Sequence, residues 1–355
     1  MRLGSKTRRW AGFGLLALIA TVGLSACADN GANFLQPAGP IADTESGIFW
    51  WLVLGVSTVV FVIVTTWLLI SIVRFRDRPG APEAHQTPGN NKVELAWTIA
   101  PAILLFIVLG FTISTMFKLD TPHNSQGQQV PITLHVTAIG HQWWWEFVYP
   151  DQKIVTADEM YIPTGQAVEV TLLSDNVIHS FWVPAIAGKV DVIPGHQNQM
   201  WMLADKAGQY RGECTEYCGN QHAHMDFAVV AVSSDAFNTW VTGQQAQSTK
   251  LVEGDPNYQG QQVFLTSGCV GCHNINGTTA PGNKIGPNLT HFGSRQWIAG
   301  EVLSNTPANL ADWILHAQDV KPDVDMPSFD GTMPPNPALS PTQITELVAY
   351  LESLK

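Results

Sequence analysis

The segment GECTEYCGNQHAHMDF (212–227) holds two thiols, two imidazoles, a thioether and a carboxylate within the twelve positions 214–225. Soft thiolate and thioether ligands combined with imidazole select copper, and a weak methionine ligand is typical of copper electron-transfer sites. A disulfide between Cys214 and Cys218 is one alternative, and a structural zinc site of two Cys and two His is another. The spacing C-x3-C-x3-H-x-H fits zinc poorly, and only copper makes use of Met225.

A further imidazole stands upstream, where a strand is expected to end. His179 lies in the segment SDNVIHSFWVP (174–184). Copper-binding sandwiches take one histidine from an early strand end and the other ligands from a late loop. Two sulfurs, two imidazoles and a thioether exceed the needs of one tetrahedral ion. They suit two copper ions bridged by both thiolates, a pair that exchanges single electrons and performs no substrate chemistry.

A second chemical signature, GCVGCH (268–273), lies near the C-terminus. C-x-x-C-H is the attachment motif of c-type haem, in which Cys269 and Cys272 form thioethers and His273 reaches the iron. A thioredoxin-type dithiol is the alternative, but it leaves His273 unexplained. A methionine is expected as the sixth ligand because it raises the reduction potential. The candidates are Met326 in KPDVDMP and Met333 in TMPP.

The elements that must position these residues are strands around the first segment and helices around the second. The stretches 132–136, 167–173 and 227–232 are rich in β-branched residues and are separated by turn signals, which predicts a sandwich or barrel over 120–240. The polar stretch 241–256 predicts a linker to a third domain, 257–355. That domain is expected to end in a helix, 343–354, with Ser340 as N-cap and Pro341 at its first position.

Two uncharged apolar runs precede the strands, at 48–73 and 95–117. Each exceeds the ~20 residues that a helix needs to span the hydrocarbon core of a membrane. Residues 28–47 contain no Lys or Arg, whereas the loop between the runs is basic. The positive-inside rule therefore places that loop in the cytoplasm and everything after Lys118 outside. The basic residues of the loop are Arg74, Arg76, Arg78 and Lys92.

The N-terminus has the layout of a signal peptide, residues 1–26, with a basic start and an apolar run from Ala11 to Ala26. The run ends in LSAC (24–27), which resembles a bacterial lipobox. Cys27 is therefore expected to be lipidated and to contact membrane lipid. An ordinary cleavage site after Ala26 is the alternative, but an exposed lone thiol is a liability outside the cell.

The formal net charge is −11, and the acidic excess lies in the part expected outside. An acidic surface excludes a nucleic-acid partner. It suits a basic protein partner, which long-range attraction would steer toward it.

The segment CTEYCGNQHAHM resembles the binuclear copper loop of cytochrome c oxidase subunit II, whose pattern is C-x-E-x-C-x3-H-x2-M. The resemblance implies that the Glu216 carboxylate binds Mg²⁺ or Mn²⁺ at the contact with the catalytic subunit, and that the His224 position is not a ligand. The copper ligands that it implies are His179, Cys214, Cys218, His222, Met225 and the backbone carbonyl of Glu216.

Three more segments extend this resemblance: GHQWWW (140–145), KVDVIPG (189–195) and VELAWTIAP (93–101). The first implies that Trp143 is the surface residue at which electrons enter; packing of the aromatic rings on both faces of a strand is the alternative. The last implies that Glu94 lies near the mouth of a proton channel in the neighbouring subunit. Otherwise Glu94 is the charged end of a membrane helix.

Residues 257–355 resemble a class I cytochrome c, with GPNL (286–289) and with KPDVDMP before the final helix. That resemblance favours Met326 over Met333 as the axial ligand. The extra Pro-rich stretch around Met333 departs from the pattern of a small cytochrome.

The expected fold is a multidomain membrane protein: a transmembrane α-helical hairpin within 27–119, a cupredoxin-like β-sandwich and a small all-α cytochrome c domain. The resemblance implies the subunit through which electrons enter a proton-translocating terminal oxidase of the respiratory chain. Expected partners are oxidase subunits I and III and a donor such as a cytochrome c or a cytochrome bc complex. The expected location is the bacterial plasma membrane, with the copper and haem domains on the periplasmic side.

Other functions require other features. A copper-binding assembly or storage protein would hold a labile single Cu(I) rather than a mixed-valence pair. A nitrous oxide reductase has a similar copper module but needs an additional His-rich domain. A quinol oxidase subunit would lack the copper ligands.

Overall fold

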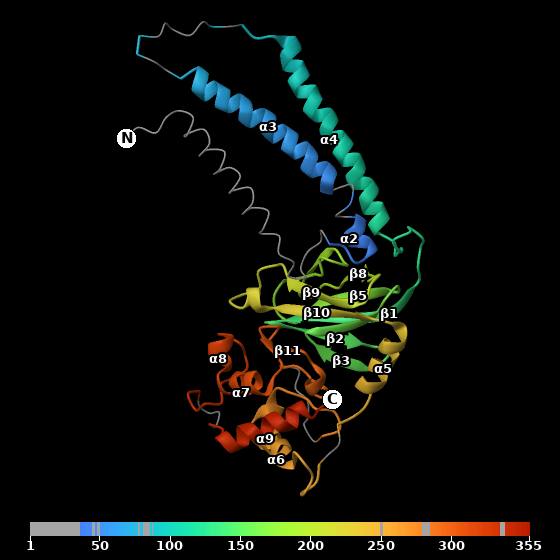
Figure 1. The fold of residues 1–355 in the computed structure, drawn as a ribbon, viewed down its shortest axis with the longest axis vertical. Coiled ribbons are helices and arrows are strands. Elements are labelled where there is room, and N and C mark those ends of the chain that lie inside the picture. Colours follow the sequence, from blue (N-terminus) through green and yellow to red (C-terminus); the bar gives the residue numbers. More distant parts are fainter. Residues whose placement is uncertain are drawn as a thin grey trace, which may run out of the picture.

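The computed structural model describes residues 36–44, 47, 50–76, 79–80, 86, 88–248, 251–278, 285–333 and 338–355. The expected signal peptide, 1–26, and Cys27 lie outside these residues. A helical hairpin lies at one end of the molecule, a β-sandwich in the middle and a helical domain at the other end (Figure 1). The sandwich therefore separates the membrane hairpin from the C-terminal domain.

The hairpin consists of helices α3 (Trp50–Arg74) and α4 (Asn91–Leu119). Both are long and apolar enough to cross a membrane, and neither has a buried residue. Helix α4 starts four residues before the apolar run at 95, because the Asn90 side chain accepts hydrogen bonds from the amides of Lys92 and Val93. A short helix, α2 (Pro40–Thr44), buries Ile41 and Ala42 at the edge of the sandwich that faces the hairpin.

Ten strands form two five-stranded sheets, which confirms the sandwich among the expected folds. The pairs β1–β5 and β4–β10 are parallel, and the other neighbours are antiparallel. One sheet has the order β3 (Ile154–Ala157), β2 (Trp144–Tyr149), β1 (Ile132–His141), β5 (Ala167–Ser174), β8 (Asn198–Met202). The other has the order β4 (Glu159–Pro163), β10 (Asp226–Val232), β9 (Gly208–Cys214), β6 (His179–Trp182), β7 (Lys189–Val192).

An aromatic cluster fills the space between the sheets. Phe181 and Phe227 stack with ring centroids 4.6 Å apart, and Trp145 meets each of them at 5.4 Å. Offset and edge-on pairs of this kind add to the stabilisation from apolar burial. The His179 ring lies 5.9 Å from the Trp145 ring, so the core supports the first residue of β6.

Helix α5 (Ser234–Gln244) closes the sandwich, with Trp240 stacked on Tyr161 at 4.7 Å. The Ser233 hydroxyl accepts from the Ala236 amide and begins the helix. The first four residues of the stretch expected as a linker, 241–244, are therefore helical. A single 3-10 turn, η2 (His222–His224), precedes β10.

The C-terminal domain packs its helices around its own apolar core. Ser340 and Gln343 form a capping box that begins α9 at Pro341, which confirms both expectations for this helix start. The helices are α6 (Tyr258–Thr266), α7 (Pro307–Leu315), α8 (Ala317–Val320) and α9 (Pro341–Glu352). The shorter elements are η3 (Cys269–Gly271), η4 (Phe292–Ser294), β11 (Trp297–Ile298) and β12 (Leu303–Ser304).

Helices α6 and α9 cross at a glycine. A Cβ on Gly260 would lie 2.0 Å from the Glu346 carbonyl oxygen, so only glycine allows this approach. Replacing Gly260 with Ala should lower the free energy of unfolding of this domain by about 2–4 kcal/mol, because the helices must separate.

Gly243→Ala in α5 is the matched control, since no atom lies within 4 Å of a Cβ there. It should be neutral or slightly stabilising. Calorimetry of the two variants measures the difference, and equal unfolding temperatures would contradict the expected role of Gly260.

Candidate metal centres

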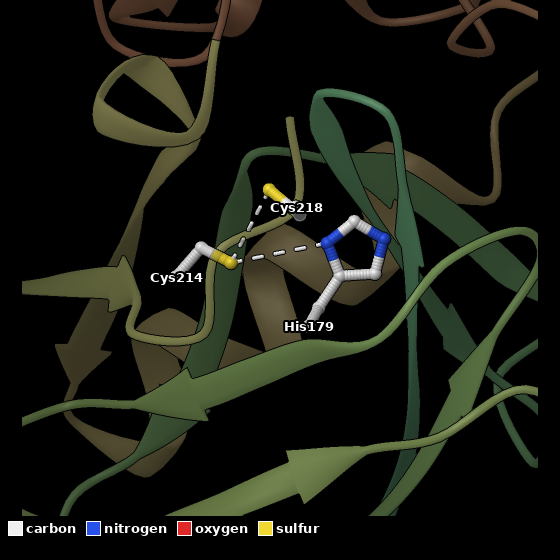
Figure 2. A group of neighbouring side chains, drawn as sticks. All are labelled: His179, Cys214 and Cys218. Atoms are coloured by element: carbon white, nitrogen blue, oxygen red, sulfur yellow. Dashed lines mark hydrogen bonds between the residues drawn. The ribbon is translucent and has the colours of Figure 1, made fainter. Parts of the chain in front are cut away.

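Three ligand side chains converge beneath the loop that follows β9. Cys214 ends β9, Cys218 lies in the loop, and His179 begins β6. The two Sγ atoms are 3.7 Å apart, and Cys214 Sγ lies 3.8 Å from His179 Nδ1 (Figure 2). All three residues are buried, and their ligand atoms lie within 4.8 Å of one another. Both cysteines are free thiols, so the disulfide alternative is not formed in the structure.

The remaining residues of the predicted copper set surround the same two sulfurs. Cys218 Sγ lies 3.6 Å from His222 Nδ1 and 3.8 Å from the thioether of Met225. Cys214 Sγ lies 3.4 Å from the Glu216 carbonyl oxygen. Two thiol sulfurs, two imidazoles, a thioether and a carbonyl oxygen therefore surround one candidate metal site. The side chains of Glu216 and His224 are exposed.

His179 is oriented by a residue that the sequence reasoning did not single out. His179 Nε2 donates to the Asn176 side-chain oxygen at 3.0 Å, which leaves Nδ1 turned toward Cys214. Hydrogen bonds to the second ring nitrogen commonly fix the orientation of a ligand histidine. A Cβ on Gly140 would lie 2.7 Å from His179 Cδ2, so the opposite strand also confines the ring. The signal for Asn176 was its place three residues before His179.

The two thiols differ in acidity. The hydrogen bond shared with Cys218 lowers the pKa of Cys214 to about 3 against the opposing effect of burial, and His179 adds to the lowering. The same hydrogen bond, followed by burial, raises the pKa of Cys218 above its ordinary value. The pair therefore releases one proton readily and retains the other. Because ligand sulfurs bind metals as thiolates, metal binding here at neutral pH would release the proton that Cys218 retains.

A second site is a cavity of about 230 Å³ in the C-terminal domain. Cys269, Cys272 and His273 line it together with apolar side chains of α6, η4, α7 and α9 and with Leu289, which precedes η4; those of the helices include Phe264, Phe292, Leu310 and Leu347. The Cys272 amide donates to the Cys269 carbonyl, and this turn sets the spacing of the two thiols. A wall of apolar side chains with two thiols and an imidazole at its edge fits a covalently attached haem.

The His273 ring is fixed for metal binding. Its Nδ1 donates to the Pro287 carbonyl at 2.8 Å, so Nε2 is the nitrogen available to a metal. A Cβ on Gly286 would lie 2.6 Å from this ring, so glycine is required where the chain passes it. Burial lowers the pKa of His273, which favours the neutral imidazole that metals bind.

The structure separates the two methionine candidates for the sixth ligand. Met326 lines the cavity, whereas Met333 is 37 % exposed and is not among the lining residues. The Gln318 side-chain amide donates to the carbonyls of Val324 and Met326, at 2.7 and 2.8 Å, and so holds this segment against the cavity. The geometry favours Met326.

The expectation that Trp143 lies on the surface is wrong, because this residue is only 8 % exposed. The indole Nε1 donates to the Cys218 carbonyl at 3.0 Å, and Trp143 is also among the residues that line the cavity of the C-terminal domain. Gln142 Nε2 donates to the same carbonyl at 2.7 Å. The C-terminal domain covers this part of the sandwich, and the local sequence around Trp143 carries no signal of that contact.

Glu94 lies in the first turn of α4, at the end of the helix that points away from the sandwich, and its side chain is exposed (Figure 1). The structure does not bring it near either metal site.

Three family models match the chain. They are described as cytochrome c oxidase subunit II, transmembrane domain (28–114), cytochrome c oxidase subunit II, periplasmic domain (152–232), and cytochrome c (258–355). They coincide with the hairpin, the larger part of the sandwich and the C-terminal helical domain.

Curated relatives match over nearly their whole length. Cytochrome c oxidase subunit 2 of Alkalihalophilus pseudofirmus is 37 % identical, covering 100 % of this chain and 99 % of the relative. That of Bacillus sp. strain PS3 is 34 % identical, covering 97 % and 96 %. Among solved structures, the periplasmic domain of subunit II of cytochrome oxidase from Bradyrhizobium japonicum is 34 % identical, with a TM-score of 0.32; the match covers 33 % of this chain and 97 % of that domain.

Replacing His179 with Ala should lower the affinity of the thiol pair for a soft metal ion by more than about 100-fold, because it removes a ligand and not merely its support. His224→Ala is the matched control, since that imidazole is exposed two residues away from His222. Metal analysis of the two purified variants provides the test. Equal metal content in both would contradict the assignment of His179.

Proposed function

This chain belongs to the cytochrome c oxidase subunit II family and is a component of a haem-copper oxidase, and on this premise we propose that electrons enter the complex through it. A c-type haem in the C-terminal domain and a binuclear copper centre in the sandwich supply one-electron carriers between an external donor and the oxygen-reducing subunit. The chain itself holds these groups, orients them and excludes water from the space between them.

Trp143 supports this proposal most directly, because one residue lies at both sites. Its indole N–H donates to the Cys218 carbonyl, between the proposed copper ligands, and the residue also lines the cavity of the cytochrome domain. An assembly or storage protein has no need of this arrangement. We propose that Trp143 conducts electrons between the two sites rather than receiving them at the surface.

The proposed copper ligands are set in a rigid frame. His179 stands against the aromatic core, and both sulfurs are buried. A frame that cannot relax keeps the ligand geometry similar in both redox states, and this suits a site that only exchanges electrons. The ligand set is His179, Cys214, Cys218, His222, Met225 and the carbonyl of Glu216. The exposed Glu216 carboxylate is free to meet a hard ion, Mg²⁺ or Mn²⁺, at the contact with the catalytic subunit.

In the cytochrome domain, Cys269 and Cys272 attach the haem, and His273 and Met326 are its axial ligands. The apolar walls of the cavity keep water from the haem and, with a methionine ligand, favour a high reduction potential.

The chain is membrane-anchored with a periplasmic domain. We propose two passes through the bacterial plasma membrane by α3 and α4, lipidation at Cys27, and contacts with oxidase subunits I and III. Glu94 then lies at the cytoplasmic end of α4, where it can meet the mouth of a proton channel in subunit I. The proposed domains are the N-terminal segment with the membrane hairpin (27–119), the copper-binding sandwich (120–240) and the cytochrome domain (257–355). Helix α5 extends four residues beyond the proposed end of the sandwich, to Gln244. The acidic outer surface suits a basic donor, such as a cytochrome c, or a cytochrome bc complex.

Trp143→Phe in the complete oxidase tests the proposed route. We expect the rate of electron transfer from haem to copper to fall on the order of tenfold, because the indole hydrogen bond to the copper loop is lost and positioned reacting groups tolerate little displacement. Reduction of the haem by the external donor should keep its normal rate. Rapid-mixing or flash spectroscopy separates the two steps.

Trp201→Phe is the matched control. Trp201 is also 8 % exposed and also donates its indole N–H to a carbonyl, that of Leu119, but it lies at the hairpin side of the sandwich. A Trp143 variant with the same haem-to-copper rate as the Trp201 variant would contradict the route.

Met326→Ala should lower the reduction potential of the haem on the order of 0.1 V and change its optical spectrum, because the sixth ligand is lost. Met333→Ala should leave both unchanged. Redox titration of the two variants measures the potential, and a lowered potential in the Met333 variant would reverse the assignment.

A further inference from the structure

The two ligand-bearing loops of the outer region lie against each other. The Gln221 side-chain amide donates to the Pro322 carbonyl at 2.8 Å, and the Asn220 side-chain amide donates to the Asp323 carboxylate at 2.7 Å. Gln221 precedes the proposed copper ligand His222, and Pro322 lies four residues before Met326. The contact therefore joins the metal-binding segments themselves and not merely the outer surfaces of the two domains.

A buried lysine stands at the centre of this contact. Lys321 belongs to the cytochrome domain and is only 2 % exposed. Its ammonium group donates to the carbonyls of Trp143 and His224, each at 2.7 Å, and of Ala299 at 2.9 Å. A lysine ammonium has three donors, so each N–H has one acceptor. Two of the acceptors belong to the sandwich and one to the cytochrome domain.

These bonds are needed because a buried charge is unfavourable without partners. Burial lowers the pKa of Lys321 to about 8, while the carboxylates of Asp158 and Asp226 in the sandwich oppose the lowering. Charge-assisted hydrogen bonds are stronger than neutral ones and demand defined geometry. The ammonium is satisfied only when Trp143, His224 and Ala299 are brought together.

A second polar contact also joins the sandwich to the cytochrome domain. One oxygen of the buried Glu159 carboxylate, in the sandwich, accepts from the backbone amides of Gln296 and Trp297 in the cytochrome domain, at 2.6 and 3.3 Å. The hydrogen bonds of Lys321 and those of Glu159 are two separate directional contacts between the domains. Together they oppose both sliding and rotation of one domain on the other.

We propose that Lys321 is a positioning residue that fastens the segment carrying Met326 to the copper loop and to Trp143, so that the cytochrome domain is a fixed relay and not a tethered shuttle. The polar stretch between the domains is long enough to suggest a swinging domain; the buried contacts oppose that motion. The electron-transfer consequence rests on the proposed function, whereas the fastening depends only on contacts between described residues.

The fastening is tested by Lys321→Met in the complete oxidase, because methionine has a similar length and leaves three carbonyls without a donor. Hydrogen–deuterium exchange is followed by mass spectrometry in peptides covering 139–145, 219–226 and 318–326. We expect exchange there to become about tenfold faster, the change that follows loss of one charge-assisted hydrogen bond. Lys206→Met, an exposed lysine in the sandwich, is the control and should match the wild type.

The positioning role is tested by flash reduction of the haem in the same variants. The haem-to-copper rate should fall roughly tenfold in Lys321→Met, as for other positioned reacting groups. The spectra and reduction potentials of haem and copper should stay unchanged. A fall accompanied by an altered haem spectrum would mean that Lys321 only shapes the haem pocket, and it would overturn the proposal. Unchanged exchange in the three peptides would also overturn it.

Wild-type protein decides the matter if the variant does not assemble. A fixed relay gives a haem-to-copper rate that is independent of solvent viscosity in sucrose, whereas a rate that falls in proportion to viscosity indicates a moving domain. Absence of copper, or of any haem-to-copper transfer, would instead refute the proposed function. The hydrogen–deuterium exchange result would then still report whether Lys321 fastens the two domains.

Discussion

The arrangement of the outer region depends on the hydrogen bonds that the carbonyl oxygen of Cys218 accepts. This oxygen accepts from the indole of Trp143 and from the side-chain amide of Gln142, while the thiol of the same residue faces Cys214, His222 and Met225. One residue therefore couples the loop of proposed copper ligands to the turn between β1 and β2, which the cytochrome domain covers. A shift of this peptide would move a proposed metal ligand and the adjoining indole together.

At each candidate site, the surrounding structure fixes the orientation of a proposed imidazole ligand. The aromatic core and Asn176 orient His179, and the carbonyl of Pro287 orients His273. Both imidazoles are thereby presented through one defined nitrogen. Such proposed ligand sets would suit electron exchange because the protein, and not the solvent, determines their geometry.

The sequence predicted the features that depend on residues close together in the chain. The motif C-x-x-C-H, the spacing of Cys214, Cys218 and His222, the apolar runs and the Ser340 cap depend on neighbouring residues, and the structure places them accordingly. The early start of α4 at Asn91 followed from a capping side chain outside the apolar pattern. The burial of Trp143 and the contacts of Lys321 were not predictable in this way, because Lys321 and Trp143 are 178 residues apart in the chain. Contacts at that separation leave no periodic or spacing signal.

The sandwich and the cytochrome domain are parts of one polypeptide, joined through α5 and the stretch after it (Figure 1). Covalent linkage replaces a bimolecular encounter with an effective concentration that does not depend on how much soluble carrier the cell provides. In the proposed route, internal transfer would therefore be first order in the oxidase and little affected by ionic strength, since no charged surfaces have to meet by diffusion. Only the proposed step from the external donor to the haem would then depend on diffusion.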